Sequence, residues 1–121
     1  MNWTRPTYVK NCAFHHGFSV AIGISGTASI PIENNVIHHT LDMGLKIESH
    51  SNVIRNNLVA LNFWPCTFVT WEAPYTLDYW GAIDVHSSET IVLENNYVAG
   101  SQRLGINYRG LIFYKLILAL E

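Results

Sequence analysis

Charge is scarce in this sequence of 121 residues, and its scarcity excludes several kinds of protein. Only 13% of the residues are charged, and the formal net charge is −2. No run of lysine and arginine supplies the basic surface that nucleic-acid binding requires, so we expect no nucleic-acid partner. No stretch approaches the roughly 18 consecutive apolar residues of a spanning helix, so we expect no membrane insertion by this segment.

Cysteine is also rare. The two cysteines, Cys12 and Cys66, are too few for a disulfide framework, and their spacing matches neither a zinc motif nor a redox motif. Whether they pair with each other is left open by the sequence. Apolar residues, in contrast, make up 49% of the chain, which indicates an ordered protein rather than a disordered one.

A short motif centred on an asparagine pair recurs along the chain. It reads IENNVI from Ile32, IRNNLV from Ile54 and LENNYV from Leu93, with a weaker copy, VKNCAF, from Val9. The second positions of these pairs are separated by 23, 22 and 39 residues: Cys12, Asn35, Asn57 and Asn96. The last interval is one period plus an insertion, so we treat the chain as a repeat protein.

A second series of segments has the same spacing. Apolar residues alternate with small or polar ones in AIGIS, GLKIES, GAIDVHS and GINYRG. Aligning these segments gives intervals of 23, 38 and 23 residues between Ile22, Leu45, Ile83 and Ile106. Both series place the long interval at the same point, which predicts an insertion over residues 62–80.

The repeat predicts an all-β protein. Each unit holds short segments with period-two alternation, bounded by Gly, Asn and Ser, and none has the 3.6-residue period of a helix. Such a unit cannot bury its apolar side alone, but stacked units share one core. We therefore predict a right-handed parallel β-helix, a pectin-lyase-like solenoid of about four partial coils with one long aromatic-rich side loop. It covers residues 1–110, and residues 111–121 form an atypical tail that caps the last coil or is a read-through end.

Equivalent residues of successive coils lie about 4.8 Å apart in such a fold, so the aligned columns are predicted neighbours. We expect the amides of Asn35, Asn57 and Asn96 to form a ladder, because an amide both donates and accepts hydrogen bonds. The residue before each pair alternates in charge from coil to coil, which favours pairing along the column: Lys10, Glu33, Arg55 and Glu94.

Two further outward columns are expected on the other strand. They run through Gly23, Lys46, Asp84 and Asn107, and through Ser25, Glu48, His86 and Arg109. Opposite charges become neighbours in both columns. We therefore expect Lys46 to lie beside Asp84 and His86 beside Glu48.

Two histidine pairs fall at the same place in neighbouring coils. They are His15-His16 and His38-His39, so four imidazoles should meet at a turn. No nearby carboxylate or cysteine completes an ordinary ligand set, and the next coils have no histidine there. We therefore expect histidines that line a turn and no cofactor, with a metal site as the alternative.

The predicted insertion is crowded with aromatic rings, which suggests a binding face. Aromatic side chains can stack on the faces of sugar rings. The candidates for such binding are Trp64, Trp71, Tyr75 and Trp80. Glu48 and Asp84, diagonal on adjacent coils, are the best candidates for the acid and base of a glycosidase. Ion pairing with the neighbouring Lys46 and His86 argues against that role, so catalysis is the alternative and no catalytic residue is expected.

Several segments together resemble the β-helix region of the fibrocystin family, also called the polycystic kidney and hepatic disease family. They are FHHGFSVAIGISGT, NVIHHTLDMGLKI, NNLVALNFWP and NNYVAGSQRLGINYRG, and the resemblance spans about residues 9 to 110. It implies a piece of a large receptor-like membrane glycoprotein with its ectodomain outside the cell or secreted. No catalytic residue of that family can be carried over to this chain.

The chain departs from the family at three points. It lacks the apolar core of a signal peptide and a membrane anchor, it has Cys66 where the resemblance implies glycine, and it ends in the unrelated stretch from Leu111 to Glu121. These departures suggest a fragment or truncated isoform. We expect a non-enzymatic structural or ligand-presenting segment, whose partners are the rest of the ectodomain and an extracellular protein or glycan. The alternative is a β-helix that binds or cleaves carbohydrate, as implied by the similarity of the family to hyaluronan-degrading proteins.

Overall fold

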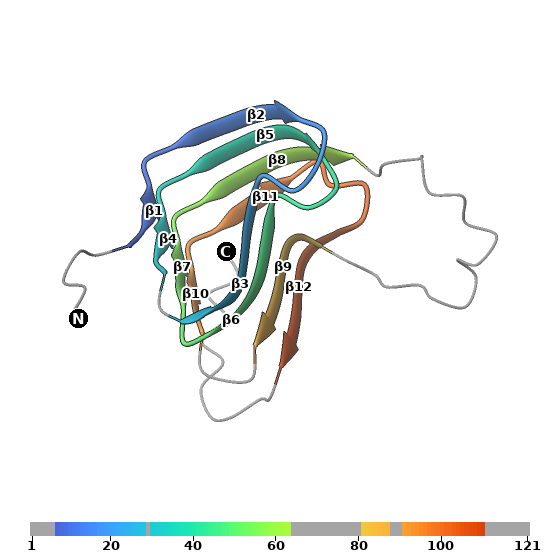
Figure 1. Ribbon diagram of the computed structural model, residues 1–121. Helices are drawn as coiled ribbons and strands as arrows, with labels where there is room; N and C mark the ends of the chain where they lie inside the picture. Colours follow the sequence, from blue (N-terminus) through green and yellow to red (C-terminus); the bar gives the residue numbers. More distant parts are fainter. Residues whose placement is uncertain (1–6, 29, 64–80, 88–90, 111–121) are drawn as a thin grey trace.

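In the part of the chain that the structure describes, twelve short strands wind through four coils, and each coil gives one strand to each of three parallel sheets (Figure 1). The computed structural model describes residues 7–28, 30–63, 81–87 and 91–110. The first sheet holds β1 (Val9–Lys10), β4 (Ile32–Glu33), β7 (Val53–Arg55) and β10 (Val92–Glu94). The second holds β2 (Ala13–Gly17), β5 (Val36–Leu41), β8 (Leu58–Phe63) and β11 (Tyr97–Ala99). The third holds β3 (Ile22–Ala28), β6 (Leu45–His50), β9 (Gly81–Ser87) and β12 (Leu104–Gly110). The right-handed parallel β-helix predicted from the sequence is confirmed.

The strand register follows the alignment of the repeats. Leu45 of β6 pairs with Ile22 of β3 on one side and with Ile83 of β9 on the other, and Ile83 pairs in turn with Ile106 of β12. The aligned column is therefore continuous from the first coil to the last. The long interval in the sequence lies between β8 and β9, so the extra residues leave the register of the coils unchanged.

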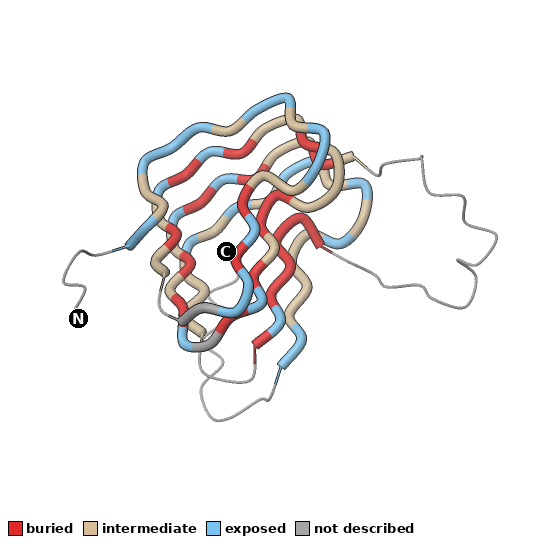
Figure 2. Tube along the Cα trace, viewed as in Figure 1, coloured by how far each residue is buried: buried red, intermediate tan, exposed pale blue. Residues whose placement is uncertain are grey.

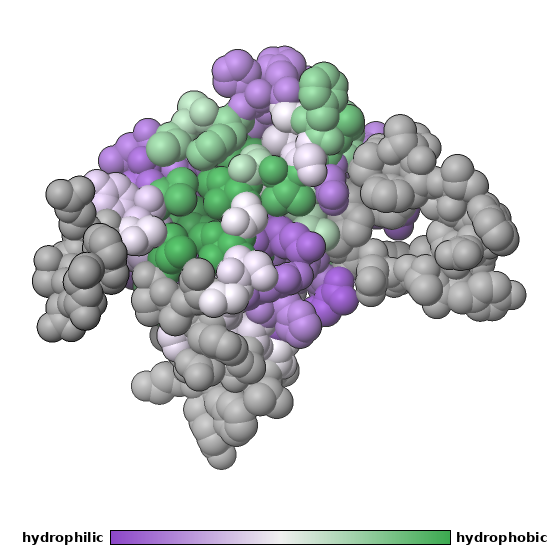
Figure 3. Space-filling view, in the orientation of Figure 1, coloured by the Kyte–Doolittle hydropathy of each residue, from purple (hydrophilic) through white to green (hydrophobic). Residues whose placement is uncertain are grey.

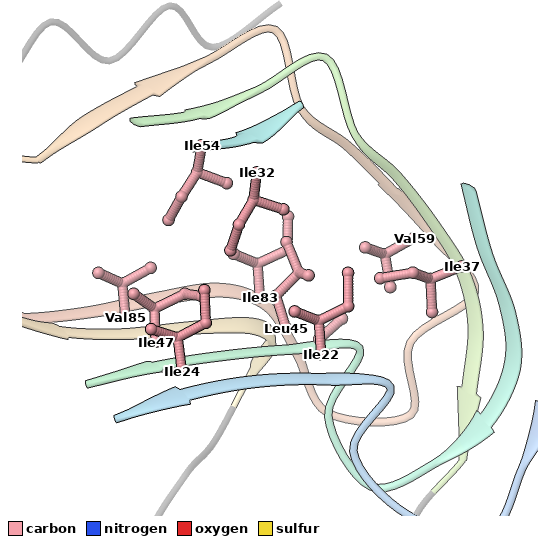
Figure 4. Close-up of a cluster of buried hydrophobic side chains, with 11 residues drawn as sticks. Ile22, Ile24, Ile32, Ile37, Leu45, Ile47, Ile54, Val59, Ile83 and Val85 are labelled. Atoms are coloured by element: carbon pink, nitrogen blue, oxygen red, sulfur yellow. The ribbon is translucent and has the colours of Figure 1, made fainter. Parts of the chain in front are cut away.

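The core fills the space between the three sheets. Residues that point inward are buried, and their neighbours on β5 and β8 are half-buried or exposed, whereas on β9 every residue but His86 is buried (Figure 2). Figure 4 shows side chains from all three sheets converging on one cluster. Its members are almost all β-branched or leucine: Ile22, Ile24, Ile32, Ile37, Leu45, Ile47, Ile54, Val59, Ala82, Ile83 and Val85. Burial of this cluster is the main source of stability, because the exposed polar columns contribute little each.

The first asparagine of each pair makes the bend between the first sheet and the second. Asn11, Asn34, Asn56 and Asn95 have φ of 56°, 57°, 56° and 51°, which is the left-handed region. Asparagine tolerates this region better than other non-glycine residues. The two residues of the pair therefore have different roles: the first bends the chain, and the side chain of the second points into the coil.

Gly44 lies at a close approach between neighbouring coils. A Cβ atom on this residue would lie 2.5 Å from Cγ1 of Val59 and 3.1 Å from the carbonyl oxygen of Ala82. Both neighbours belong to the next coil, and both are buried. A residue with a Cβ atom would clash with Val59 at this position, which explains why glycine precedes Leu45.

Among the residues that the structure describes, none forms a helix long and apolar enough to cross a membrane. The aromatic candidates of the insertion, Trp64, Trp71, Tyr75 and Trp80, lie outside the described residues, as do Cys66 and the tail 111–121.

Candidate functional site

The second asparagines of the pairs form the ladder expected from the sequence. Nδ2 of Asn35 donates to Oδ1 of Asn57 at 3.0 Å, and Nδ2 of Asn57 donates to Oδ1 of Asn96 at 2.9 Å. At the first coil Cys12 takes the place of an asparagine; its backbone N–H donates to Oδ1 of Asn35 at 3.0 Å, but its thiol donates to the carbonyl oxygen of Lys10 and not to the ladder. The amide ladder therefore runs over three coils and stops at Cys12.

Asn57, in the middle of the ladder, uses all of its amide hydrogen-bonding capacity. Its Nδ2 donates to Asn96 and to the carbonyl oxygen of Ile32, both at 2.9 Å. Its Oδ1 accepts from the backbone N–H of Asn35 at 3.1 Å and from Nδ2 of Asn35 at 3.0 Å. The side chain is fully buried. An amide with two donors and two acceptors occupied has no atom left for a reacting group.

A chain of ion pairs follows the charged column of the first sheet. Lys10 Nζ lies 3.3 Å from Glu33 Oε2, Glu33 Oε1 lies 3.8 Å from Arg55, and Arg55 Nε donates to Glu94 Oε2 at 2.9 Å. The alternation of sign in the sequence thus becomes an unbroken chain over four coils. Pairs this exposed contribute up to about 1 kcal/mol each, so the column fixes register more than stability.

The carboxylates proposed for catalysis have different surroundings. Glu48 is exposed, and its Oε1 lies 3.5 Å from Nζ of Lys46 on the same strand. Asp84 is 7% exposed; its Oδ2 accepts from the backbone N–H of Gly81 at 3.1 Å and from Nδ2 of Asn107 at 3.0 Å. Arg109 lies 4.0 Å from the same oxygen. Asp84 therefore serves as a local hydrogen-bond acceptor in the third sheet.

The outward columns of the third sheet have the predicted register but other pairings. Lys46 is aligned with Asp84 and Glu48 with His86, as expected. The ion pairs of the described residues, however, join Lys46 to Glu48 and Arg109 to Asp84. Asp84 lies between the core residues Ile83 and Val85 on β9, so its side chain is on the outward face of the sheet as expected, although only 7% of it is exposed.

The two histidine pairs meet on β2 and β5. Nδ1 of His15 lies 2.9 Å from Nδ1 of His16, and Nδ1 of His39 lies 3.0 Å from Nε2 of His38. The rings of His16 and His39 are stacked, with centroids 5.0 Å apart and planes 3° apart. His38 stands edge-on to both, at 4.2 Å from His39 and 6.1 Å from His16. The sequence predicted this meeting of four imidazoles.

The surroundings of His39 change its pKa. Burial lowers the pKa of His39, and the neighbouring His38 and His16 lower it further. In the described part of the chain, no three His, Cys, Asp or Glu side chains are arranged to hold a metal ion.

A second left-handed column, absent from the sequence prediction, bends the chain beside the cluster. His16, His39 and Leu61 have φ of 54°, 55° and 56°, and Gly100 of the last coil has 69°. The glycine in this column was the available signal, since a position that glycine fills in one coil often needs positive φ in all of them. The bend turns the second histidine of each pair toward its neighbour.

Comparison with known proteins places this geometry in a family. Residues 5–111 match the family described as a right handed beta helix region. The chain is 40% identical over 104 residues to fibrocystin-L of Homo sapiens and 39% identical to that of Mus musculus, with 86% of this chain covered in each case. It is 31% identical over the same length to fibrocystin of Mus musculus. The chain spans only 2% of the length of each of these relatives. No solved structure matches it.

Proposed function

The chain belongs to the right-handed β-helix family and is similar to the β-helix region of fibrocystin-L, and from that premise we propose that it is a non-enzymatic segment of a receptor-like ectodomain. Its role is to hold a rigid surface, either as a structural spacer or to present a ligand site. The proposed place of action is the extracellular side of the plasma membrane or the secreted space. The proposed partners are the rest of that ectodomain and an extracellular protein or glycan.

The observation that carries this proposal is the use of the polar side chains along the coils. Both donors and both acceptor positions of the Asn57 amide are hydrogen-bonded within the coils, and Asp84 accepts two hydrogen bonds inside its own sheet. A general acid or base needs a group that is within reach of substrate and has a pKa adapted to proton transfer. Glu48 is within reach of solvent, and its Oε1 forms an ion pair with the ammonium group of Lys46 at 3.5 Å.

The experiment that tests the proposal compares Glu48→Gln with Asp84→Asn. For a structural role, neither the parent chain nor the Glu48→Gln variant turns over hyaluronan oligosaccharides, and Glu48→Gln keeps the parent melting temperature. Asp84→Asn lowers the melting temperature, because it weakens the contacts with Gly81, Asn107 and Arg109. Turnover that is present in the parent and lost in Glu48→Gln would establish the enzymatic alternative instead.

A further inference from the structure

The core columns of the solenoid are sealed in its middle coils and partly open at its two ends. In the second and third coils the inward residues of the three sheets are fully buried: Ile32, Ile37, Leu45, Ile47, Ile54, Val59, Ile83 and Val85. The corresponding residues of the last coil are only half-buried: Leu93, Val98, Ile106 and Tyr108. In the first coil, Val9 and Phe14 are half-buried in the same way. Each end of the solenoid therefore presents apolar surface that one more coil would cover.

The strands at the two ends are also the edges of the sheets. In the described part of the chain, each sheet has one outer strand in the first coil and one in the last: β1 and β10, β2 and β11, β3 and β12. The outer side of an edge strand carries backbone N–H and C=O groups that can pair with another strand. We call the outer side of β1, β2 and β3 the first-coil face, and that of β10, β11 and β12 the last-coil face.

A hollow opens on the first coil. It has a volume of about 540 Å³ and is lined mainly by residues of this coil, among them Phe14, Val20 and Ala21. Figure 3 shows apolar side chains gathered in the opening that β1, β2 and β3 surround. On the last coil, in contrast, Leu104 at the start of β12 is a large apolar side chain that is 42% exposed.

The two faces match each other in the register of the repeat. If a second copy continued the coils of the first, the columns would join its first-coil face to the last-coil face of its neighbour. Apolar residues would then meet in four inward columns: Val9 with Leu93, Phe14 with Val98, Ile22 with Ile106 and Ile24 with Tyr108. Leu104, two residues before Ile106, would fall opposite Val20 at the hollow.

The charged column of the first sheet makes the two faces complementary in charge. Its sign alternates over four coils, so it begins with Lys10 on the first-coil face and finishes with Glu94 on the last-coil face. These side chains are 35% and 39% exposed. Glu94 contacts Arg55 through Oε2, and a carboxylate can accept through its other oxygen as well. In the continued column, Lys10 of one copy therefore comes beside Glu94 of the next.

We propose that the first-coil face binds the last-coil face of a second copy of this chain, so that copies stack head-to-tail into one continuous β-helix. The contact joins two different surfaces, so the assembly grows instead of closing into a dimer. The amide ladder is interrupted at the junction, because Asn96 meets Cys12, which has no side-chain oxygen to accept from Nδ2 of the asparagine. The inference depends only on the ends of the solenoid and not on the role proposed above.

The test is sedimentation velocity of the full 121-residue chain at increasing concentration, with a reductant because Cys12 is an exposed free thiol. We expect the mean mass to rise from monomer through dimer to longer species. Glu94→Gln should raise the dissociation constant up to about fivefold, which is the value of one exposed ion pair. The matched control is Glu48→Gln, because it makes the same change of charge in an ion pair of similar exposure within the second coil. It should associate as the parent does.

Two further comparisons separate this contact from general stickiness. Cys12→Asn should strengthen association, because it supplies the oxygen that continues the ladder across the junction. Glu94→Lys makes the charged column positive at both ends, and Lys10→Glu makes it negative at both ends. Each of these two variants should associate less than the parent, and an equimolar mixture should regain association, because each face then meets its opposite.

The charge reversals also oppose Arg55 or Glu33 within the column, so circular dichroism checks that each variant keeps the fold. If either reversal unfolds the chain, Glu94→Gln against Glu48→Gln and the effect of Cys12→Asn decide the question. A chain that stays monomeric at every concentration would overturn the proposal and favour residues 111–121 as a cap of the last coil. A dimer that grows no further would show a closed contact instead. Association that is equal in Glu94→Gln, Cys12→Asn and the parent would show general aggregation of apolar surface.

Discussion

Nδ2 of Asn57 donates to Oδ1 of Asn96 at 2.9 Å, although 39 residues separate the two in the chain. The corresponding bond between Asn35 and Asn57 spans 22 residues. The same contact is thus made across the ordinary repeat and across the insertion. The ladder is a property of the stacked coils, and its geometry is the same across the long interval as across the ordinary one.

Replacing Asn57 with alanine should cost about 3 kcal/mol of unfolding free energy, because several buried hydrogen bonds are lost and their partners are left unsatisfied. Urea unfolding measures the effect. The matched control is Asn56→Gly. Asn56 is exposed and left-handed, and glycine adopts that conformation freely, so the control should change stability by less than about 1 kcal/mol. Equal losses in the two variants would contradict the role of the ladder.

Reversing the charge of Arg55 tests the ion-pair column. Arg55→Glu places a third carboxylate between Glu33 and Glu94 and should destabilise the fold by about 1 kcal/mol at low salt. The loss should shrink in 1 M sodium chloride, where exposed charges are screened. The double variant Arg55→Glu/Glu94→Arg restores one pair and should recover part of the loss. A loss that is independent of salt would indicate a packing effect.

Adding a methyl group at Gly44 tests the close approach of neighbouring coils. Gly44→Ala drives a Cβ atom into buried Val59 and toward Ala82, and it should cost about 1–3 kcal/mol. Gly23→Ala is the control, since the nearest atom to its Cβ, on Val20, is 3.9 Å away. That variant should be neutral or slightly stabilising. Melting temperatures of the two variants, measured side by side, decide between packing and a general effect of losing glycine.

Stability should fall in acid because of the histidine cluster. The pKa of His39 is lowered in the folded chain, so the folded state favours the neutral ring. The stabilising contribution is present above the ordinary histidine pKa and is lost as pH falls through the lowered one. In chloride, the melting temperature should therefore drop between pH 7 and pH 5. His16→Asn/His39→Asn should flatten this part of the curve, and an unchanged slope would show that other groups cause it.

The fold could be predicted from the sequence because two independent columns repeat with the same spacing. The charge alternation through Glu33 and Arg55 and the amide column through Asn35 and Asn57 fix one register, and the structure has that register. Each depends only on which residues are neighbours in adjacent coils. Strand register depends on the spacing of equivalent residues along the chain, and that spacing can be read from the sequence of a repeat protein.

The candidate site was less predictable, because it depends on side-chain direction. Asp84 occupies the expected position in β9, yet its carboxylate turns to Gly81 and Asn107 instead of Lys46. Likewise, the histidine pairs revealed that four rings meet, but not that His16 and His39 adopt the left-handed conformation that stacks them. Side-chain rotamers and backbone φ depend on which nearby hydrogen-bonding and packing partners are available. An alignment of the repeats does not contain that information.

The measurement that tests the central claim most directly is hydrogen exchange and NOE spectroscopy of the asparagine amides in the isolated chain. The account predicts slow exchange of the backbone N–H of Asn35 and Asn57, because each donates to a side-chain oxygen in the next coil, on buried Asn57 and half-buried Asn96 respectively. It also predicts NOEs between the Nδ2 protons of Asn35 and those of Asn57. Fast exchange at both residues, with no NOE between their side chains, would contradict the laddered β-helix and the structural role built on it.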